Sequence, residues 1–212
     1  YLGGVSEEER AAAVEQIAQA LRREGSAPYI IYNGASSARG ALGYVEAAAE
    51  LWEQISSNAE RAAIRNVCIP GGNGGLAAGF IYGTALLGNP FHVELISVEH
   101  EAEPLREIIS AFLKDLEKLC GVPMPCPLEQ TATLHGAYRF GGWGIITPEG
   151  EEFCIRFART EGIFIEKVYT CKTLYGMCDL AEKGYFHDGA CYLHSGGIGA
   201  LFSQYHIPGG GV

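Results

Sequence analysis

The stretch that decides the fold is Asn66–Gly79, NVCIPGGNGGLAAG, in which a short apolar run leads into a segment rich in glycine. The apolar run predicts a buried β-strand, and the residues after the glycines begin a helical pattern. Glycines at such a turn let successive backbone N–H groups approach an anion at the positive end of the helix. The stretch therefore predicts a βα unit with an anion-binding loop, and a tight turn with close helix packing is the structural alternative.

Strands and helices alternate on both sides of this unit. Near the N-terminus, Ser6 and Glu9 form a capping-box pattern that predicts a helix as far as Gly25. The other expected strands are Tyr29–Tyr32, His92–Ser97, a short one near Ile163–Ile165, and Ala190–His194. The other expected helices are Gly40–Ser56, Pro104–Leu119, Glu149–Arg159 and Thr173–Glu182, with a proline-containing connection over Gly121–Thr131.

This alternation predicts an α/β fold with an open, mostly parallel sheet and helices on both faces. Ligands of such sheets bind at the carboxyl ends of the strands, so function is expected in the turns after Ile69 and His194. We expect residues 1–27 to form an N-terminal helix and connection, residues 28–207 to form the α/β region, and residues 208–212 to form a frayed tail.

The composition narrows the class of partner. The 212 residues are 48% hydrophobic and carry a formal net charge of -10, which opposes binding to nucleic acid or to an anionic membrane surface. A small molecule or another protein is therefore a better candidate for the binding partner. We expect no membrane-spanning segment, and seven cysteines without a CxxC pair predict reduced thiols in the cytoplasm. The six histidines are scattered, so no metal site is predicted.

Taken by itself, the glycine-rich loop also fits a nucleotide site. Gly72–Ala77 matches GxGxxA, and Glu99 follows the next strand, where a ribose-binding acid would stand. The loop follows an expected helix, strand and helix, whereas the dinucleotide fingerprint normally belongs to the first βα unit of its domain. A nucleotide-binding oxidoreductase is therefore the third hypothesis for the function.

Four other pieces of sequence carry a family resemblance. They are PYIIYNGASSARGALGYVEAAAEL at 28–51, ARTEG at 158–162, VYT at 168–170 and HSGG at 194–197. In this order they resemble the C-terminal part of the 1-aminocyclopropane-1-carboxylate (ACC) deaminase and D-cysteine desulfhydrase family, whose members are fold type II enzymes related to the tryptophan synthase β subunit. The segment 163–201 is especially similar. The resemblance covers most of the chain and implies the large domain of an enzyme dependent on pyridoxal 5'-phosphate (PLP).

The resemblance also implies the cofactor-binding residues. The loop Gly72, Asn73, Gly74, Gly75 and Leu76 corresponds to the family's phosphate loop, with Asn73 and Leu76 replacing a serine and a threonine. Ser195 stands where a hydroxyl faces the pyridine nitrogen. Thr170 follows the active-site tyrosine as in the desulfhydrases, whereas the deaminases have glutamate there. From the residues alone, Ser195 would instead cap the last helix.

Two aromatic residues are the implied catalytic candidates. Tyr169 matches a tyrosine that the family places near the substrate, where its phenol binds or relays a proton. Trp143 replaces a second active-site tyrosine of the family. This replacement keeps an aromatic side chain at the site but removes the phenolic hydroxyl. Packing is the structural alternative for both residues.

The family's Schiff-base lysine has no counterpart in this chain. It belongs to a GNKxRK-like segment that precedes the matching region, and the five lysines present, Lys114, Lys118, Lys167, Lys172 and Lys183, lack that context. The leading hypothesis is the C-terminal part, or one subunit, of a PLP enzyme acting on a small amino acid by elimination or deamination. A companion polypeptide or a missing segment would supply the lysine. The alternative is a non-catalytic pseudoenzyme or regulatory subunit, acting by self-association or binding.

Overall fold

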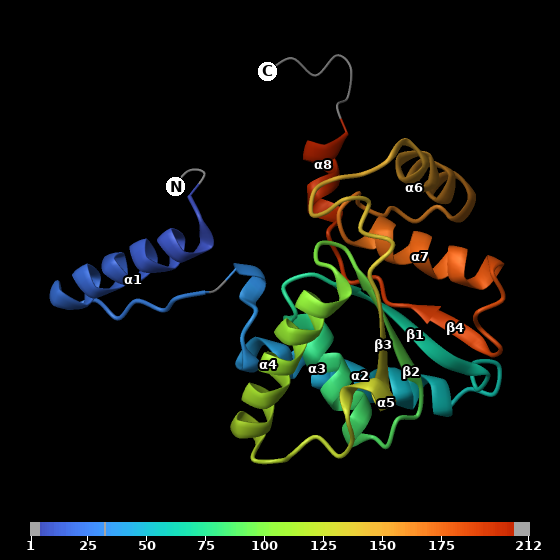
Figure 1. Ribbon diagram of the computed structural model, residues 1–212, viewed down its shortest axis with the longest axis horizontal. Helices are drawn as coiled ribbons and strands as arrows, with labels where there is room; N and C mark the ends of the chain where they lie inside the picture. The colour runs from blue at the N-terminus through green and yellow to red at the C-terminus, as the bar shows by residue number, and fades with distance from the viewer. Residues whose placement is uncertain (1–4, 32, 206–212) are drawn as a thin grey trace. The chain divides into compact units, whose positions relative to one another are not determined.

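The computed structural model of the protein describes residues 5–31 and 33–205 (Figure 1). Those residues form two compact units that divide between Ala35 and Ser36. The first unit contains α1 (Glu7–Arg23) and the 3-10 turn η1 (Asn33–Ala35). The predicted capping box is confirmed, since Ser6 Oγ accepts a hydrogen bond from the Glu9 N–H (3.2 Å) and the Glu9 carboxylate accepts one from the Ser6 N–H (2.8 Å).

The second unit is built on a four-stranded sheet, β1 (Ile64–Gly71), β2 (His92–Ser97), β3 (Ala132–His135) and β4 (Gly189–Tyr192). The strand order is β3-β2-β1-β4, and each neighbouring pair is parallel. Gly71 pairs with Ser97 at the carboxyl ends of the two central strands. The expected parallel α/β fold is confirmed, and the turns that follow β1, β2 and β4 lie at one edge of the sheet.

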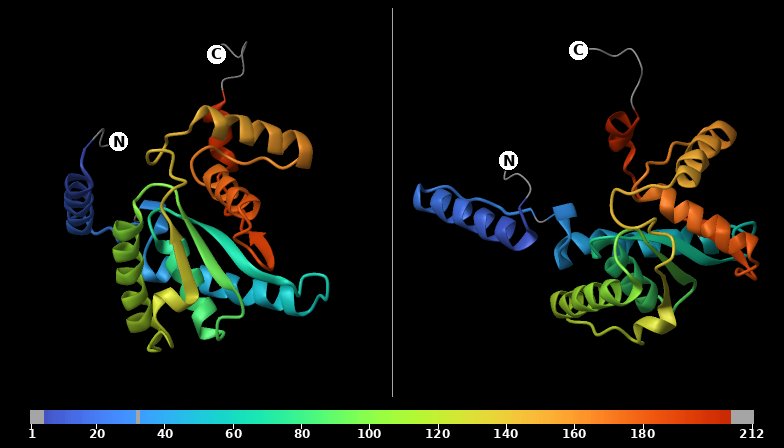
Figure 2. Two further views of the ribbon diagram at one scale, coloured as in Figure 1. Left: turned by 45° about the vertical axis from the view of Figure 1, so that its right-hand side comes forward. Right: turned by 45° about the horizontal axis from the view of Figure 1, so that its top comes forward.

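Helices cover both faces of this sheet (Figure 2). One face is covered by α3 (Gly75–Leu86) and α4 (Ala102–Cys120), and α2 (Ala38–Ser56) packs against α3. The other face carries α7 (Thr170–Glu182), with α6 (Pro148–Glu161) packed on it. The short helices α5 (Leu128–Thr131), η2 (Ile198–Ala200) and α8 (Leu201–Gln204) complete the unit.

The side chains of β2 show how the two layers divide the core. Val93 and Leu95 belong to the cluster under α3 and α4, whereas Ile96 packs with Tyr138 and Leu180 on the side of α7. This alternation is the period-two pattern of a strand buried on both faces. The sheet is therefore enclosed on both sides, and its carboxyl edge is where loops of different elements meet.

Two expected strands are wrong. Tyr29 and Ile31 are exposed and belong to none of the four described strands, and Tyr32 lies outside the described residues. The residues near 163–165 form a loop instead. Gly162 ends α6 in the left-handed conformation (φ 68), and the carbonyl of Phe164 accepts a hydrogen bond from His194 Nε2 (2.9 Å) rather than from a strand.

Other elements differ in extent. β3 was not expected, because the four residues at the sheet edge give too short a periodic pattern. α7 begins at Thr170 rather than Thr173, and the expected tail at 208–212 lies outside the described residues. Among the described helices, none combines the length and the apolar character needed to cross a membrane.

Candidate functional site

The glycine-rich loop lies between the end of β1 and the first turn of α3. Gly74 is the N-cap residue of α3 and has a left-handed backbone (φ 91), which favours glycine. A β-carbon at position 72 would lie 3.1 Å from Cε1 of Tyr169, and one at position 75 would lie 3.1 Å from Oγ of Ser36. The loop is thus held closely between two other segments, with its backbone at the positive end of a 12-residue helix.

Tyr169 and Trp143 are brought together beside this loop. The indole Nε1–H of Trp143 donates a hydrogen bond of 2.8 Å to the phenolic oxygen of Tyr169. Trp143 is 58% exposed, so it is not the buried core residue of the structural alternative. Because an indole N–H only donates, the Tyr169 oxygen accepts in this bond and its own proton points elsewhere.

Glu166 organises the turn that presents Tyr169. Its side chain is 1% exposed, and its carboxylate accepts hydrogen bonds from the backbone N–H groups of Val168 (2.7 Å), Tyr169 (2.5 Å) and Thr170 (2.7 Å). A carboxylate that binds several N–H groups at the start of a helix is a strong anchor. The sequence reasoning missed Glu166, because a glutamate just after an expected short strand gives no local sign of this role.

Thr170 is tied to the same turn. Its Oγ1 accepts a hydrogen bond from the Glu166 N–H (2.7 Å), and the residue is buried. The carbonyl of Thr170 accepts a hydrogen bond from the hydroxyl of Tyr192 (3.3 Å), which is the last residue of β4. The position proposed for a cofactor contact is therefore also part of the connection between α7 and β4.

Ser195 follows β4 at the carboxyl edge of the sheet. It precedes Gly196 (φ 112) and Gly197 (φ 83), and a β-carbon at position 197 would lie 2.5 Å from Cγ of Glu166. The turn after β4 thus packs on the residue that anchors Tyr169. Ser195 is not the N-cap of a described helix, since Gly197 caps η2 and Ala200 caps α8. The capping alternative is therefore wrong.

Lys172 fixes the loop that carries Trp143. Its Nζ donates hydrogen bonds to the carbonyl oxygens of Val98 (3.0 Å), Arg139 (2.9 Å) and Gly142 (2.6 Å). The side chain is fully buried, and this burial lowers the pKa of Lys172 to about 8. Val98 also donates its N–H to the Gly71 carbonyl (2.9 Å), so one ammonium group links the loops after β1 and β2 to the Trp143 loop.

The donors present suit a phosphorylated, planar cofactor. The glycine loop offers backbone N–H groups and, at Gly72, a surface against Tyr169 that a larger residue would fill. No group of His, Cys, Asp or Glu side chains in the described part of the chain is arranged to hold a metal ion. The earlier strand expected at Tyr29–Tyr32 is not part of the described sheet, so the glycine loop belongs to the first βα unit of that sheet, where a dinucleotide fingerprint normally lies.

Comparison with known proteins shows the family to which the chain is similar. The sequence profile of the family described as pyridoxal-phosphate dependent enzyme matches residues 3–196. A putative 1-aminocyclopropane-1-carboxylate deaminase of Pyrococcus horikoshii is 33% identical over 188 residues, which are 89% of this chain and 55% of that protein. A putative 1-aminocyclopropane-1-carboxylate deaminase of Pyrococcus furiosus is 32% identical over the same share of each chain.

A solved structure agrees with these relatives. The crystal structure of an ACC deaminase homologue matches with a TM-score of 0.80 and 30% sequence identity, over 96% of this chain and 62% of that chain. This chain spans about half the length of the curated relatives it matches. From the fold, the glycine loop and these relatives together, the chain belongs to the family of pyridoxal-phosphate dependent enzymes.

Proposed function

We propose that this chain is the C-terminal part, or one subunit, of a PLP-dependent enzyme that acts on a small amino acid by elimination or deamination. The observation that carries the proposal is the meeting of the glycine loop after β1 with Tyr169 at the start of α7. The relatives named as putative 1-aminocyclopropane-1-carboxylate deaminases support the substrate class.

In this proposal the loop Gly72–Leu76 binds the cofactor phosphate and Ser195 binds the pyridine nitrogen. When bound, PLP supplies an electron sink for bonds broken at the substrate's carbon. A neutral serine hydroxyl does not require a protonated ring nitrogen, so Ser195 moderates that electron sink. Thr170 acts together with Glu166 by holding the turn that faces the loop.

Tyr169 is the proposed group for proton transfer to or from the substrate. The hydrogen bond from Trp143 occupies a lone pair of the phenolic oxygen and leaves the phenolic proton available to another acceptor. If a tyrosine stood at position 143, either phenol could donate in this hydrogen bond, so its direction would not be fixed. Trp143 thus replaces a second phenol with an aromatic surface and with an N–H group that can only donate to Tyr169.

The lysine that holds the cofactor is proposed to come from another polypeptide or from a segment outside these 212 residues. Lys172 is fully buried and donates to three carbonyl oxygens, which suits a structural role. Lys114, Lys118 and Lys183 are exposed, and Lys167 forms an ion pair with Glu151. None of the five therefore combines a free amine with a position beside the loop.

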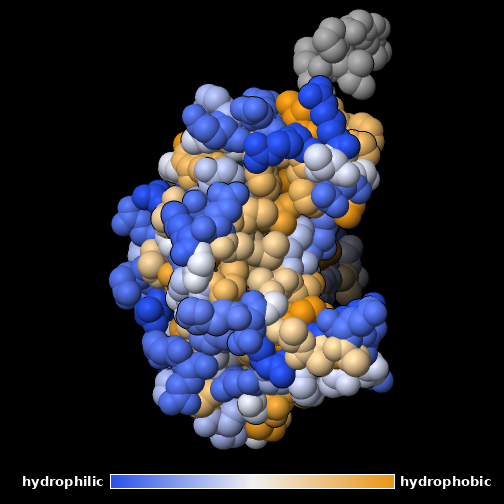
Figure 3. All heavy atoms as spheres, turned by 90° about the vertical axis from the view of Figure 1, so that its right-hand side faces the viewer, coloured by the Kyte–Doolittle hydropathy of each residue, from blue (hydrophilic) through white to orange (hydrophobic). Residues whose placement is uncertain are grey.

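Exposed apolar surface supports the presence of such a companion. Phe164, Ile198 and Phe202 are 62%, 40% and 83% exposed. Figure 3 shows hydrophobic surface between hydrophilic side chains on the face that lies at the right of Figure 1. Apolar surface of this kind on a folded domain commonly marks an interface.

Borohydride reduction followed by denaturing intact-mass analysis tests the proposal. Reduction fixes PLP covalently onto the polypeptide whose lysine holds it, so the native assembly is supplied with PLP, reduced and separated into its chains. We expect a pyridoxyl adduct on a lysine outside these 212 residues. The matched control is an assembly with Lys172→Met, which should carry the same adduct.

An adduct on this chain that disappears in the Lys172→Met assembly would contradict the companion lysine and assign that role to Lys172. The absence of an adduct from every chain, with PLP supplied, would favour the alternative function.

That alternative is a pseudoenzyme that keeps the scaffold as a binding or regulatory subunit. It is favoured by Asn73 and Leu76, which lack the two hydroxyls of the family's phosphate loop, and Leu76 instead packs against the core. The pseudoenzyme predicts no turnover of amino acids with any lysine-bearing partner. Turnover restored by such a partner would exclude it.

A further inference from the structure

A pair of buried cysteines lies behind the proposed active site, in α6 and at the start of α7. Cys154 is 2% exposed and Cys171 is fully buried, and both belong to the apolar cluster between the two helices. Sγ of Cys171 donates to the carbonyl of Gly150 (3.2 Å), which stands one helical turn before Cys154 on the same face of α6. The two side chains interact within this cluster, and each shifts the pKa of the other.

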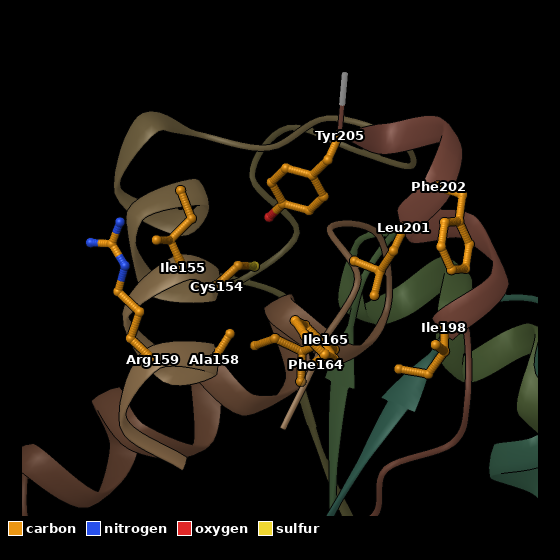
Figure 4. Close-up of a pocket in the computed structure, with 10 residues that line it drawn as sticks. All are labelled: Cys154, Ile155, Ala158, Arg159, Phe164, Ile165, Ile198, Leu201, Phe202 and Tyr205. Carbon is orange, nitrogen blue, oxygen red and sulfur yellow. The ribbon is translucent and has the colours of Figure 1, made fainter. Parts of the chain in front are cut away.

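Cys154 lines a cavity of about 420 Å³ between α6, the loop at 163–165 and α8. Figure 4 shows the sulfur of Cys154 directed inward from α6 and the hydroxyl of Tyr205 pointing toward it. The Tyr205 hydroxyl is within hydrogen-bonding reach of that sulfur. A small solute that enters the cavity therefore meets Cys154, whereas the buried Cys171 does not line the cavity.

We propose that Cys154 and Cys171 are a redox-active dithiol that a small peroxide, entering through this cavity, converts into a disulfide. The Cys154 thiolate attacks the peroxide, forming an S–O bond while the O–O bond breaks, and the leaving hydroxide takes up a proton to become water. The Cys171 sulfur then attacks the Cys154 sulfur, the S–O bond breaks, and the second hydroxide takes up the Cys171 proton. Two thiols are oxidised by two electrons and one peroxide is reduced to two waters.

The electrostatics favour this order of attack. The interaction with Cys171 lowers the pKa of Cys154 from its ordinary value, and the same interaction, together with burial, raises the pKa of Cys171. Burial raises the pKa of Cys68, Cys178 and Cys191, which disfavours their thiolates. Of these five, Cys154 is the thiol best suited to act as the nucleophile.

The disulfide would join α6 to the first turn of α7. Cys171 lies between Thr170 and Lys172, and its N–H donates to the carbonyl of Glu166 (2.9 Å). Oxidation would therefore act on the segment that carries Tyr169. This inference concerns the 212-residue chain alone and holds whether or not the chain takes part in catalysis.

Peptide mapping of the folded chain after treatment with hydrogen peroxide tests the proposal. The protein is then unfolded in acid, its free thiols are alkylated, and it is digested with trypsin without reductant. We expect peptide 140–156 joined to peptide 168–172, with a mass two hydrogens below the sum of the two. The link should disappear on addition of dithiothreitol.

Three variants complete the design. Cys154→Ala and Cys171→Ala should each abolish the link, whereas the matched control Cys178→Ala, in the middle of α7, should retain it. If Cys171→Ala does not fold, Cys171→Ser keeps a donor for the Gly150 carbonyl and should also abolish the link. The proposal is overturned if peroxide oxidises the exposed Cys120 while Cys154 and Cys171 remain open to alkylation, or if Cys154 is joined to any other cysteine.

Discussion

At the scale of single residues, Lys172 links several segments of the site, and no motif of the sequence indicated this role. Its ammonium group binds carbonyl oxygens in two loops. One of these oxygens belongs to Val98, which lies 74 residues away in the sequence. The carbonyls of Arg139 and Gly142 also accept backbone N–H groups, so the lysine adds a second hydrogen bond at each. The residue thus holds the Trp143 loop against the end of the sheet, although the sequence placed it only within a family-like segment.

The Lys172→Met substitution should therefore destabilise the fold. Methionine fills a similar volume, but the three carbonyl oxygens lose the ammonium donor, and a buried polar group left unsatisfied costs about 1–3 kcal/mol. Removal of a desolvated charge offsets part of this, so we expect a net loss of about 3 kcal/mol in the free energy of unfolding. Urea denaturation measures it, with the exposed Lys114→Met as the matched control, which should change stability by less than about 0.5 kcal/mol.

The contribution of Lys172 also depends on pH. The pKa of Lys172 is about 8 in the folded chain, whereas an unperturbed lysine titrates near 10.5. Between these values the unfolded chain binds more protons than the folded one, so stability rises with pH in that window and is unaffected by this group below it. The wild type should gain stability relative to Lys172→Met between about pH 8 and pH 10. A constant difference across this range would contradict the shifted pKa.

Asn73 is the residue at which the phosphate loop can be tested directly. The Asn73→Ser substitution restores a hydroxyl that the family uses, and one net hydrogen bond contributes about 0.5–1.5 kcal/mol. We expect the affinity for PLP to rise roughly 2- to 10-fold in isothermal titration of the assembled protein. The nearly isosteric Asn73→Asp adds negative charge beside the loop and should weaken binding. Equal affinities for the three proteins would place the phosphate elsewhere.

At the scale of secondary-structure elements, the contact of α2 with α3 sets the orientation of the glycine loop. A β-carbon at Gly79 would lie 2.1 Å from the carbonyl oxygen of Ala41, and one at Gly83 would lie 2.7 Å from that of Val45. These glycines let the two helix backbones approach closely. The structural alternative for the glycine-rich region, close helix packing, therefore holds for Gly79, while Gly72–Gly75 form the turn itself.

The Gly79→Ala substitution tests this contact. Because the added methyl group meets backbone rather than a movable side chain, α3 must shift, and we expect a loss of about 3 kcal/mol in the free energy of unfolding. The matched control is Gly43→Ala on α2, where the added methyl group meets no atom within 4 Å. That change should stabilise the fold by roughly 0.5–1 kcal/mol, since alanine has the higher helix propensity. Thermal denaturation of both variants separates the two effects.

At the scale of the whole molecule, the carboxyl edge of the sheet combines segments that are far apart in sequence. The loops after β1, β2 and β4 meet there with the first turn of α7 and the Trp143 loop. This is the edge at which open parallel sheets bind their ligands. If a companion segment supplies the lysine, as proposed, the same segment is expected to close the site at this edge.

Linkage between binding and stability tests that expectation. If PLP binds only the folded assembly, PLP at a hundred times its Kd should raise the free energy of unfolding by about 2.7 kcal/mol. We expect this rise, measured by thermal denaturation, when the lysine-bearing companion is present. The isolated chain should gain much less. An equal gain for the isolated chain would show that it holds the cofactor unaided.

The sequence by itself determined the elements whose signals are local. The capping box at Ser6, the strand at His92–Ser97, the glycine turn before α3 and the alternation that makes the sheet parallel follow from periodicity and turn chemistry over a few residues. The order of the motifs along the chain also indicated the family. These features needed no knowledge of distant contacts.

The tertiary structure decided everything that depends on partners far along the chain. Tyr29–Ile31 and the residues near 163–165 have strand-like composition but no neighbouring strand, whereas Ala132–His135 forms one because β2 offers it an edge. The role of Lys172 arises in the same way, because its ammonium group reaches the Val98 carbonyl from α7. Hydrogen bonds to buried charged groups are made across the fold, so local sequence patterns do not encode them.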